Sequence, residues 1–154
     1  MQPQKKRHTP DEALPKAQKY CAYQERCHQE VRNKLYELGL YPNEVEEVIM
    51  KLIEQNFVNE ERFAIAYAGG KFRVKKWGRN KILQELKLRQ ISDYCIRQAM
   101  KEIPDRDYIK TLQSLIAKKE KEVREPNLFK KRQKIAKYLI TKGYEPELVW
   151  DSLK

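Results

Sequence analysis

Leu35-Tyr-Glu-Leu-Gly39-Leu40 is the first of three copies of one pattern in this chain. The second copy is Leu86-Lys-Leu-Arg-Gln90-Ile91 and the third is Leu139-Ile-Thr-Lys-Gly143-Tyr144, so the turn positions 39, 90 and 143 are 51 and 53 residues apart. Each copy has a leucine four residues before the turn position and a hydrophobic residue directly after it. A repeat of this length usually marks one supersecondary unit per copy, with the units stacked along an axis. The pattern therefore predicts an array of three units that presents an extended binding surface.

Helical periodicity continues through the chain from Lys16 onward. Hydrophobic residues recur three and four positions apart, which is the spacing of one helix face. Only 5 of the 154 residues are glycine, which disfavours a turn-rich β protein. We therefore expect an all-α fold of nine helices, as an elongated array of three tandem three-helix repeats. The expected parts are an N-terminal lead at 1–14 and repeats at 15–58, 59–103 and 104–154.

The N-terminal lead is basic and rich in proline. Pro3, Pro10 and Pro15 discourage a continuous helix there, so we expect a flexible segment. The stretch from Thr9 to Glu12 resembles a capping box, but it precedes Pro15 closely and is expected to form at most one turn. The first helix is accordingly expected to begin near Lys16.

Hydrophobic stripes define the expected inward face of each later helix. Because interfaces between small modules are limited in area, we expect the repeats to move relative to one another. The expected stripes are Val31, Leu35 and Leu38; Val45, Val48, Ile49 and Leu52; Phe63, Ala66, Tyr67 and Gly70; Ile82, Leu83 and Leu86; Ile96, Ala99, Met100 and Ile103; Ile109, Leu112, Leu115 and Ile116; Phe129, Ile135, Tyr138 and Leu139; and Val149, Trp150 and Leu153.

Charge is unevenly distributed along the chain. The net charge is +11, which favours a polyanionic partner, nucleic acid before an anionic membrane surface. Residues 41–61 contain six glutamates and one lysine, whereas residues 71–90 contain eight basic residues and one glutamate, and residues 118–137 contain nine and three. Such segregation favours binding, with solubility as the alternative. The acidic block is most simply a solvated face, and contact with a basic partner is its other interpretation.

Two basic stretches are the candidate nucleic-acid-binding residues. The first surrounds an expected helix break and interleaves with Phe72 and Trp77. Lysine and arginine neutralise phosphates, and an aromatic ring can stack on an unpaired base. We expect the two aromatic residues to pack in the core, with base stacking as the alternative. The candidates are Lys71, Arg73, Lys75, Lys76, Arg79 and Lys81 in the first stretch, and Lys130, Lys131, Arg132 and Lys134, with Lys137 beyond them, in the second.

The sequence contains no recognisable catalytic or metal-binding constellation. Gly69-Gly70 lacks the flanking residues of a phosphate-binding loop. The Cys27-His28 pair supplies two metal donors at most, and the three cysteines, at 21, 27 and 95, match neither a disulfide framework nor a CxxC site. We therefore expect reduced thiols, no enzymatic activity, no metal and no cofactor.

The expected location of the protein is the cytoplasm, because the sequence shows no membrane-spanning or secretory segment. No uninterrupted apolar run approaches the roughly 20 residues of a membrane-spanning helix. Residues 1–8 are polar and basic and lack the apolar segment of a secretory signal. We expect a monomer without a membrane partner.

Three segments of the chain are similar to motifs of one protein family. Asn59-Glu-Glu-Arg-Phe-Ala-Ile-Ala-Tyr67 resembles the D-x-x-R-F-A-x-x-Y segment of the RecX family, small regulators of the recombinase RecA. Residues 73–86 carry an R…G…I…L run similar to that of the family, and residues 26–35 resemble its R-x-x-x-E-L-x-x-K-L segment. The resemblance extends from about residue 16 to the end. Three positions depart from the family pattern. Asn59 replaces the usual acid and can still cap a helix, whereas Cys27 stands where the family often has serine, which weakens the cap of the following helix. Gln90 stands where the family has glycine, so the turn there could differ from that of the family.

The resemblance implies both a fold and a function. The fold would be an all-helical series of three-helix repeats. The protein would lie in the groove of the RecA filament on single-stranded DNA and hinder filament growth, ATP hydrolysis, strand exchange and coprotease activity, thereby modulating recombination, DNA repair and the SOS response. Double-stranded DNA would be a further ligand. The residues leave two other hypotheses open: a helix-turn-helix transcription factor, and a scaffold that binds only protein.

Overall fold

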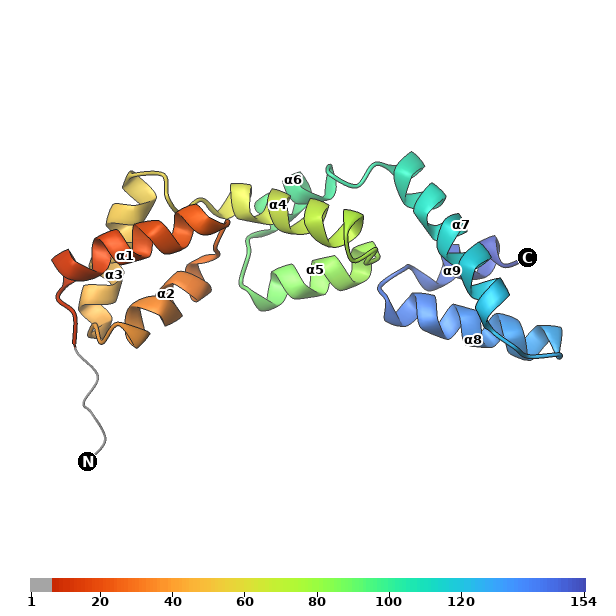
Figure 1. Cartoon of the computed structure of the whole chain (residues 1–154). Helices are drawn as coiled ribbons and strands as arrows, with labels where there is room; N and C mark the ends of the chain where they lie inside the picture. The colour runs from red at the N-terminus through yellow and green to blue at the C-terminus, as the bar shows by residue number, and fades with distance from the viewer. Residues whose placement is uncertain (1–6) are drawn as a thin grey trace, which may run out of the picture. The chain divides into compact units, whose positions relative to one another are not determined.

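The computed structural model describes residues 7–154, which form nine α-helices and no β-strand (Figure 1). The helices are α1 Pro10–Tyr23, α2 His28–Glu37, α3 Pro42–Glu54, α4 Glu60–Arg73, α5 Arg79–Leu88, α6 Asp93–Met100, α7 Asp105–Glu122, α8 Leu128–Thr141 and α9 Pro146–Ser152. They form three successive three-helix repeats, α1–α3, α4–α6 and α7–α9, so the all-α prediction is confirmed. The chain divides into two compact units, the first ending at Phe63 and the second comprising Ala64–Lys154.

The repeated sequence pattern ends α2, α5 and α8 with the same turn. The turn residue adopts a left-handed backbone conformation, with φ of 88° at Gly39, 59° at Gln90 and 111° at Gly143. The N–H of the following residue donates to the carbonyl five residues earlier, with N···O distances of 3.3, 3.2 and 3.1 Å respectively. This is the Schellman motif. Gln90 therefore forms the same turn as the two glycines, and the replacement adds backbone strain without changing the geometry.

The buried hydrophobic residues on both sides of each turn explain why the pattern repeats. The leucine that supplies the accepting carbonyl and the residue that follows the turn are buried in all three copies, as the motif favours. These residues are Leu35 and Leu40, Leu86 and Ile91, and Leu139 and Tyr144.

The first helix begins earlier than the prolines predict. It starts at Pro10 and not near Lys16, and Thr9 caps it by accepting a 3.2 Å hydrogen bond from the backbone N–H of Glu12. Pro10 occupies the first helical position, where proline is tolerated. Pro15 lies inside the helix, but the neighbouring turns bury their alanines fully, and this packing outweighs the lost hydrogen bond. The rest of the predicted flexible lead, residues 1–6, lies outside the described residues.

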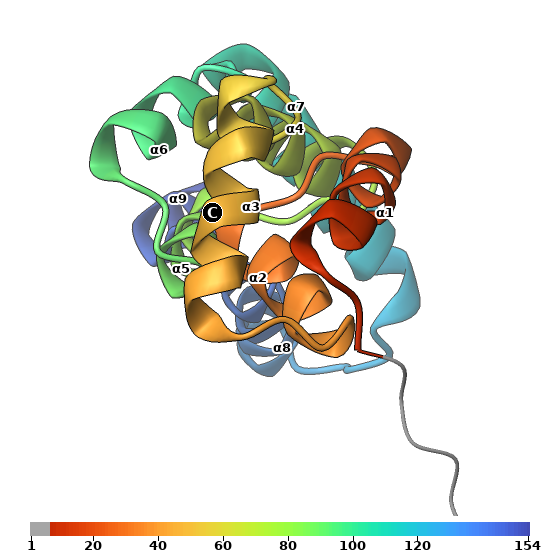
Figure 2. The ribbon, with the colours of Figure 1, turned by 90° about the vertical axis from the view of Figure 1, so that its left-hand side faces the viewer.

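The first unit packs α1, α2 and α3 around one hydrophobic core. Figure 2 looks onto this unit, with α1 and α2 seen nearly end-on and α3 crossing them. The predicted stripe of α3 is buried along its whole length, and Leu38 of the α2 stripe is only partly buried. Asn59 caps α4 by accepting from the N–H of Arg62 at 2.8 Å, as expected. Cys27 makes no side-chain cap to α2, which confirms the weaker cap expected there.

Two glutamates of the acidic block form ion pairs within the first unit. Glu46 on α3 accepts hydrogen bonds from Arg32 on α2 at 2.9 and 3.3 Å, and Glu44 pairs with Arg7. These ion pairs join segments of the same repeat, so this acidic stretch is more than a uniformly solvated face.

The second unit contains an aromatic core shared by its two repeats. Phe72 of α4 lies with its ring centroid 6.0 Å from that of Tyr108 of α7, which stacks on Tyr144 at 5.1 Å. The hydroxyl of Tyr144 donates to the carbonyl of Lys76 at 2.9 Å. The second and third repeats therefore share one core and belong to one compact unit. This packing opposes the expected movement between these two repeats, which stays a prediction.

Three predicted inward faces, those of α4, α8 and α9, include residues that are exposed in the structure. In α4 the predicted Phe63 is buried, but Ala66 is exposed, and the core face continues through Ala64, Ala68 and Phe72. Phe129 is 66% exposed because it lies in the first turn of α8, before the buried stretch begins. Trp150 is 40% exposed beside the buried Val149.

Candidate nucleic-acid interface

The first basic stretch lies at the connection between α4 and α5. After α4 ends at Arg73, Lys76 has a left-handed backbone with φ of 59°, and its N–H donates to the carbonyl of Phe72 at 3.0 Å. Gly78 then caps α5 and donates its own N–H to the carbonyl of Lys142 at 2.9 Å. The α4–α5 connection is thus joined by a backbone hydrogen bond to the turn after α8.

Trp77 lies within a cluster of cations. It is half-buried, and the ammonium nitrogens of Lys81 and Lys71 lie 4.4 and 5.0 Å from its ring centroid. The ring of Tyr67 packs edge-to-face against it, with the two ring centroids 6.4 Å apart. Such contacts stabilise the cations over the ring. Phe72 is buried at 5% exposure, which confirms its place in the core. Trp77 is neither a fully buried core residue nor an open stacking platform.

Arg79 is the candidate that the structure engages internally. Its guanidinium donates to the carbonyl of Ile103 at 2.8 Å and to Asp105 at 2.6 Å, and it lies 4.1 Å from the ring centroid of Tyr108. Its backbone N–H donates to the Tyr108 hydroxyl, which in turn donates to Glu145. Burial, together with the Glu145 carboxylate, raises the pKa of Tyr108 far above that of free tyrosine. We therefore assign Arg79 to joining the two repeats.

The other candidates of the first stretch make no ion pair within the described part of the chain. Three of them are exposed, and the other two flank Trp77 in a partly exposed position. Their charge is accordingly available to a polyanion. The exposed residues are Arg73, Lys75 and Lys76, and the flanking pair is Lys71 and Lys81.

The second basic stretch lies within α8. Asn127 caps this helix by accepting from the N–H of Lys130 at 3.0 Å. Lys130 and Lys134 are exposed and lie one turn apart, whereas Lys131 and Arg132 are partly exposed on other sides of the helix. The ammonium of Lys134 pairs with Glu125 at 2.9 Å, and this hydrogen bond lowers the pKa of the glutamate.

The two basic stretches meet in one hollow, which we name the junction groove. It has a volume of about 490 Å³ and no acidic residue in its lining. Lys81 of the first stretch and Lys134 of the second both line it. Tyr138 also lines it, and the ammonium nitrogens of Lys119 and Lys142 lie 3.9 and 5.5 Å from the ring centroid of this tyrosine. The lining residues are Lys81, Lys134, Lys137, Tyr138, Thr141 and Lys142.

Sequence reasoning missed part of this groove for identifiable reasons. The spacing of Lys134, Lys137 and Thr141 along one helical face was visible in the sequence. Tyr138 was expected in the core, yet it is 37% exposed. Lys142 belongs to the turn after α8, and only the backbone contact with Gly78 places it near Lys81.

Residues 7–154 show neither a cluster of metal ligands nor an exposed cysteine. They contain no group of three or more histidine, cysteine, aspartate or glutamate side chains that could hold a metal ion. The cysteines are free and buried, and burial raises the pKa of the Cys21 thiol to about 11, so it is protonated at neutral pH. Within the same range, no helix combines the length and apolar character needed to cross a membrane.

Comparison with known proteins shows which family this chain resembles. Models described as the first, second and third three-helix domains of RecX match residues 13–52, 59–100 and 106–153. A regulatory protein RecX of Bacillus cereus strain B4264 is 27% identical over 130 residues, which are 84% of this chain and 48% of the relative. One of Bacillus cytotoxicus is 26% identical over the same shares. The chain thus spans about half the length of the curated relatives it matches.

Solved structures show the same fold. The crystal structure of RecX from Lactobacillus salivarius is similar with a TM-score of 0.82 at 24% identity, covering 94% of both chains. A second crystal structure, of a regulatory protein RecX, has a TM-score of 0.79 at 22% identity and covers 90% of this chain and 71% of the other. With family models matching all three of its repeats, the chain belongs to the RecX family of regulatory proteins.

Proposed function

We propose that this protein binds the RecA filament on single-stranded DNA and inhibits the recombinase, ATPase and coprotease activities of RecA. One observation carries the proposal: in a chain of the RecX family, lysines from two basic stretches about fifty residues apart line one groove that lacks acidic residues. A nucleoprotein filament presents a regular series of phosphates, and lysines in a groove neutralise them by displacing counterions.

The proposed interface consists of the junction groove and further cations of the two basic stretches. Lys71, Lys75 and Arg73 lie on the α4 side, and Lys130 and Lys134 lie on α8. Contacts distributed over more than one repeat raise the effective concentration of each later contact, so several weak contacts produce tight binding. A bound protein of this kind would obstruct filament extension without catalysing any reaction. We expect it to act as a monomer in the cytoplasm.

The test is the ATPase activity of RecA on single-stranded DNA, titrated with the full chain at two salt concentrations. We expect inhibition at low ratios of protein to RecA, and weaker inhibition at the higher salt. The variant Lys81→Glu combined with Lys137→Glu should weaken inhibition while leaving the helix content unchanged. The matched control is Lys101→Glu, a charge reversal at an exposed lysine outside the groove.

The outcomes distinguish the proposal from its alternatives. Unchanged RecA turnover at saturating protein would refute inhibition. Equal inhibition by the groove variant and the wild-type chain would show that the interface lies outside the junction groove. Preferential binding to one duplex sequence would instead support the transcription-factor hypothesis, and binding to RecA without any affinity for nucleic acid at low salt would support a protein-only scaffold.

A further inference from the structure

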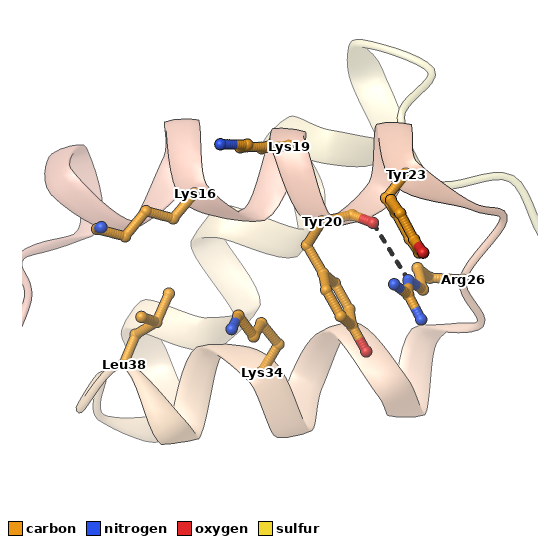
Figure 3. A pocket seen from close by; sticks show the side chains of 7 residues that line it. All are labelled: Lys16, Lys19, Tyr20, Tyr23, Arg26, Lys34 and Leu38. Atoms are coloured by element: carbon orange, nitrogen blue, oxygen red, sulfur yellow. Dashed lines mark hydrogen bonds between the residues drawn. The ribbon is translucent and has the colours of Figure 1, made fainter.

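A second cationic hollow lies within the first unit, between α1 and α2 (Figure 3). Its volume is about 470 Å³, within the usual range for small-ligand sites. No acidic residue lines it. The lining residues are Lys16, Lys19, Tyr20, Tyr23, Arg26, Lys34 and Leu38, none of which belongs to the basic stretches described above.

The hollow follows from the spacing of residues on α1. Lys16, Lys19, Tyr20 and Tyr23 are three and four residues apart and therefore share one helix face. The core face of the same helix carries small residues, including Ala17, which let α1 approach the other helices closely. Long basic and aromatic side chains consequently project along the line where α1 and α2 meet.

Arg26 forms one side of the hollow through its contacts with Tyr20. Its Nε donates to the backbone carbonyl of Tyr20 at 3.2 Å, its guanidinium lies 3.8 Å from the Tyr20 ring centroid, and it pairs with Glu30 at 3.6 Å (Figure 3). Burial raises the pKa of the Tyr20 hydroxyl, with Arg26 opposing and Glu30 and Glu37 reinforcing the change. The hydroxyl therefore remains a neutral donor at physiological pH.

The three lysines are free to meet an anion. Lys16, Lys19 and Lys34 make no ion pair within the described part of the chain, and the ammonium of Lys34 lies 5.5 Å from the Tyr20 ring centroid. Figure 3 shows Lys34 and Leu38 on one side of the Tyr20 ring, and Tyr23 and Arg26 on the other. Positive charge and aromatic rings therefore alternate along the hollow.

Tyr23 is the residue that indicates what kind of anion binds. Its side chain is 82% exposed, at the C-terminal end of α1, and its ring centroid lies 5.9 Å from the Arg26 guanidinium carbon. A phosphate or an acidic peptide would need only the cations. An exposed aromatic face beside cations is the arrangement that binds an unpaired base together with its phosphate.

We propose that this hollow binds an unpaired nucleotide of single-stranded nucleic acid. The phosphate lies among Lys16, Lys19 and Lys34, and the base stacks on Tyr23. A duplex keeps its bases paired and stacked and cannot present one to the tyrosine, so single strands are preferred over duplexes. The site needs no recombinase, which separates it from the function proposed above.

The experiment measures binding of a short fluorescent oligothymidylate to the full chain by anisotropy, without RecA. Tyr23→Ala should weaken binding about 5- to 150-fold, the equivalent of one lost stacked base, whereas Tyr23→Trp should retain it. The control is Tyr36→Ala, which removes an exposed tyrosine of α2 outside the hollow. Combining Lys16→Ala with Lys34→Ala should reduce the dependence of log K on log salt by about 0.7 for each phosphate that the protein no longer neutralises.

A crosslink locates the base directly. An oligonucleotide containing 5-iodouracil should crosslink to Tyr23 on irradiation, identified by peptide mass spectrometry. Unchanged affinity of Tyr23→Ala, or equal affinity of the wild-type chain for a duplex of the same length, overturns the proposal. Competition by polyglutamate but not by single-stranded DNA would show that the hollow binds an acidic protein. Inhibition of RecA does not enter these measurements, so either proposal can fail alone.

Discussion

Substitution of Gly78 by alanine tests whether the local backbone or the tertiary packing requires a glycine at the start of α5. Its backbone has φ of −76° and ψ of 165°, a conformation that any residue adopts without strain. If only the local backbone mattered, Gly78→Ala should stabilise the protein by about 0.4–1 kcal/mol, because alanine lowers the conformational entropy of the unfolded chain. The tertiary structure predicts the opposite sign.

The close approach of two backbones determines that sign. A Cβ built on Gly78 would lie 2.2 Å from the carbonyl carbon of Gly143 and 2.3 Å from the backbone nitrogen of Tyr144, whereas ordinary contacts are 3.4–4 Å. Separating the chains enough to admit a methyl group would break two 2.9 Å hydrogen bonds, from Gly78 to Lys142 and from Asn80 to Gly143. Each broken bond costs about 1–3 kcal/mol where a buried group is left unpaired, so we expect a net destabilisation of about 2–4 kcal/mol.

Urea unfolding followed by tryptophan fluorescence measures this change. Both tryptophans of the chain, Trp77 and Trp150, belong to the second unit, which is the unit that contains Gly78. The matched control is Gly70→Ala, since Gly70 lies inside α4 and a Cβ there would meet nothing within 4 Å. That variant should gain about 0.8–1 kcal/mol from the higher helix propensity of alanine. Gly78→Ala as stable as the wild-type chain would refute the steric argument.

Three further changes test other parts of the structure. Gln90→Gly should raise stability by about 0.5–1 kcal/mol in chemical denaturation, because relief of the left-handed strain exceeds the entropy that glycine adds to the unfolded chain, and Gln90→Ala should change little. Tyr108→Phe should lower stability by about 1–3 kcal/mol, since its hydroxyl links a backbone N–H to Glu145, and a decrease below about 0.5 kcal/mol would contradict that role. Arg32 donates to Glu46 and lowers its pKa, so the pair stabilises the fold above the ordinary carboxyl range and loses this effect as pH falls through the lowered pKa. Glu46→Gln should therefore cost about 0.2–1 kcal/mol at neutral pH and nothing in acid, and a pH-independent decrease would point to another cause.

The candidate interface shows where sequence reasoning reaches its limit. Charge segregation identified both basic stretches, because blocks of like charge are a property of the sequence. The internal role of Arg79 could not be predicted, because its partners Ile103 and Asp105 are 24 and 26 residues away, after α6 and at the start of α7. The α1–α2 hollow was missed because its residues are interspersed with neutral ones, and only the helix geometry aligns Lys16 with Tyr23.

The features that follow from the sequence alone are local in origin. Helix periodicity, the caps and the three turns after α2, α5 and α8 depend on residues within a few positions of one another, so the all-α fold with three repeats follows from the pattern around Gly39, Gln90 and Gly143. Only the folded chain establishes which contacts join the repeats of the second unit. The approach of Gly78 to Gly143 and the stacking of Tyr108 on Tyr144 bring together residues 36 to 65 positions apart, and their energies depend on distances between backbones that no local pattern encodes.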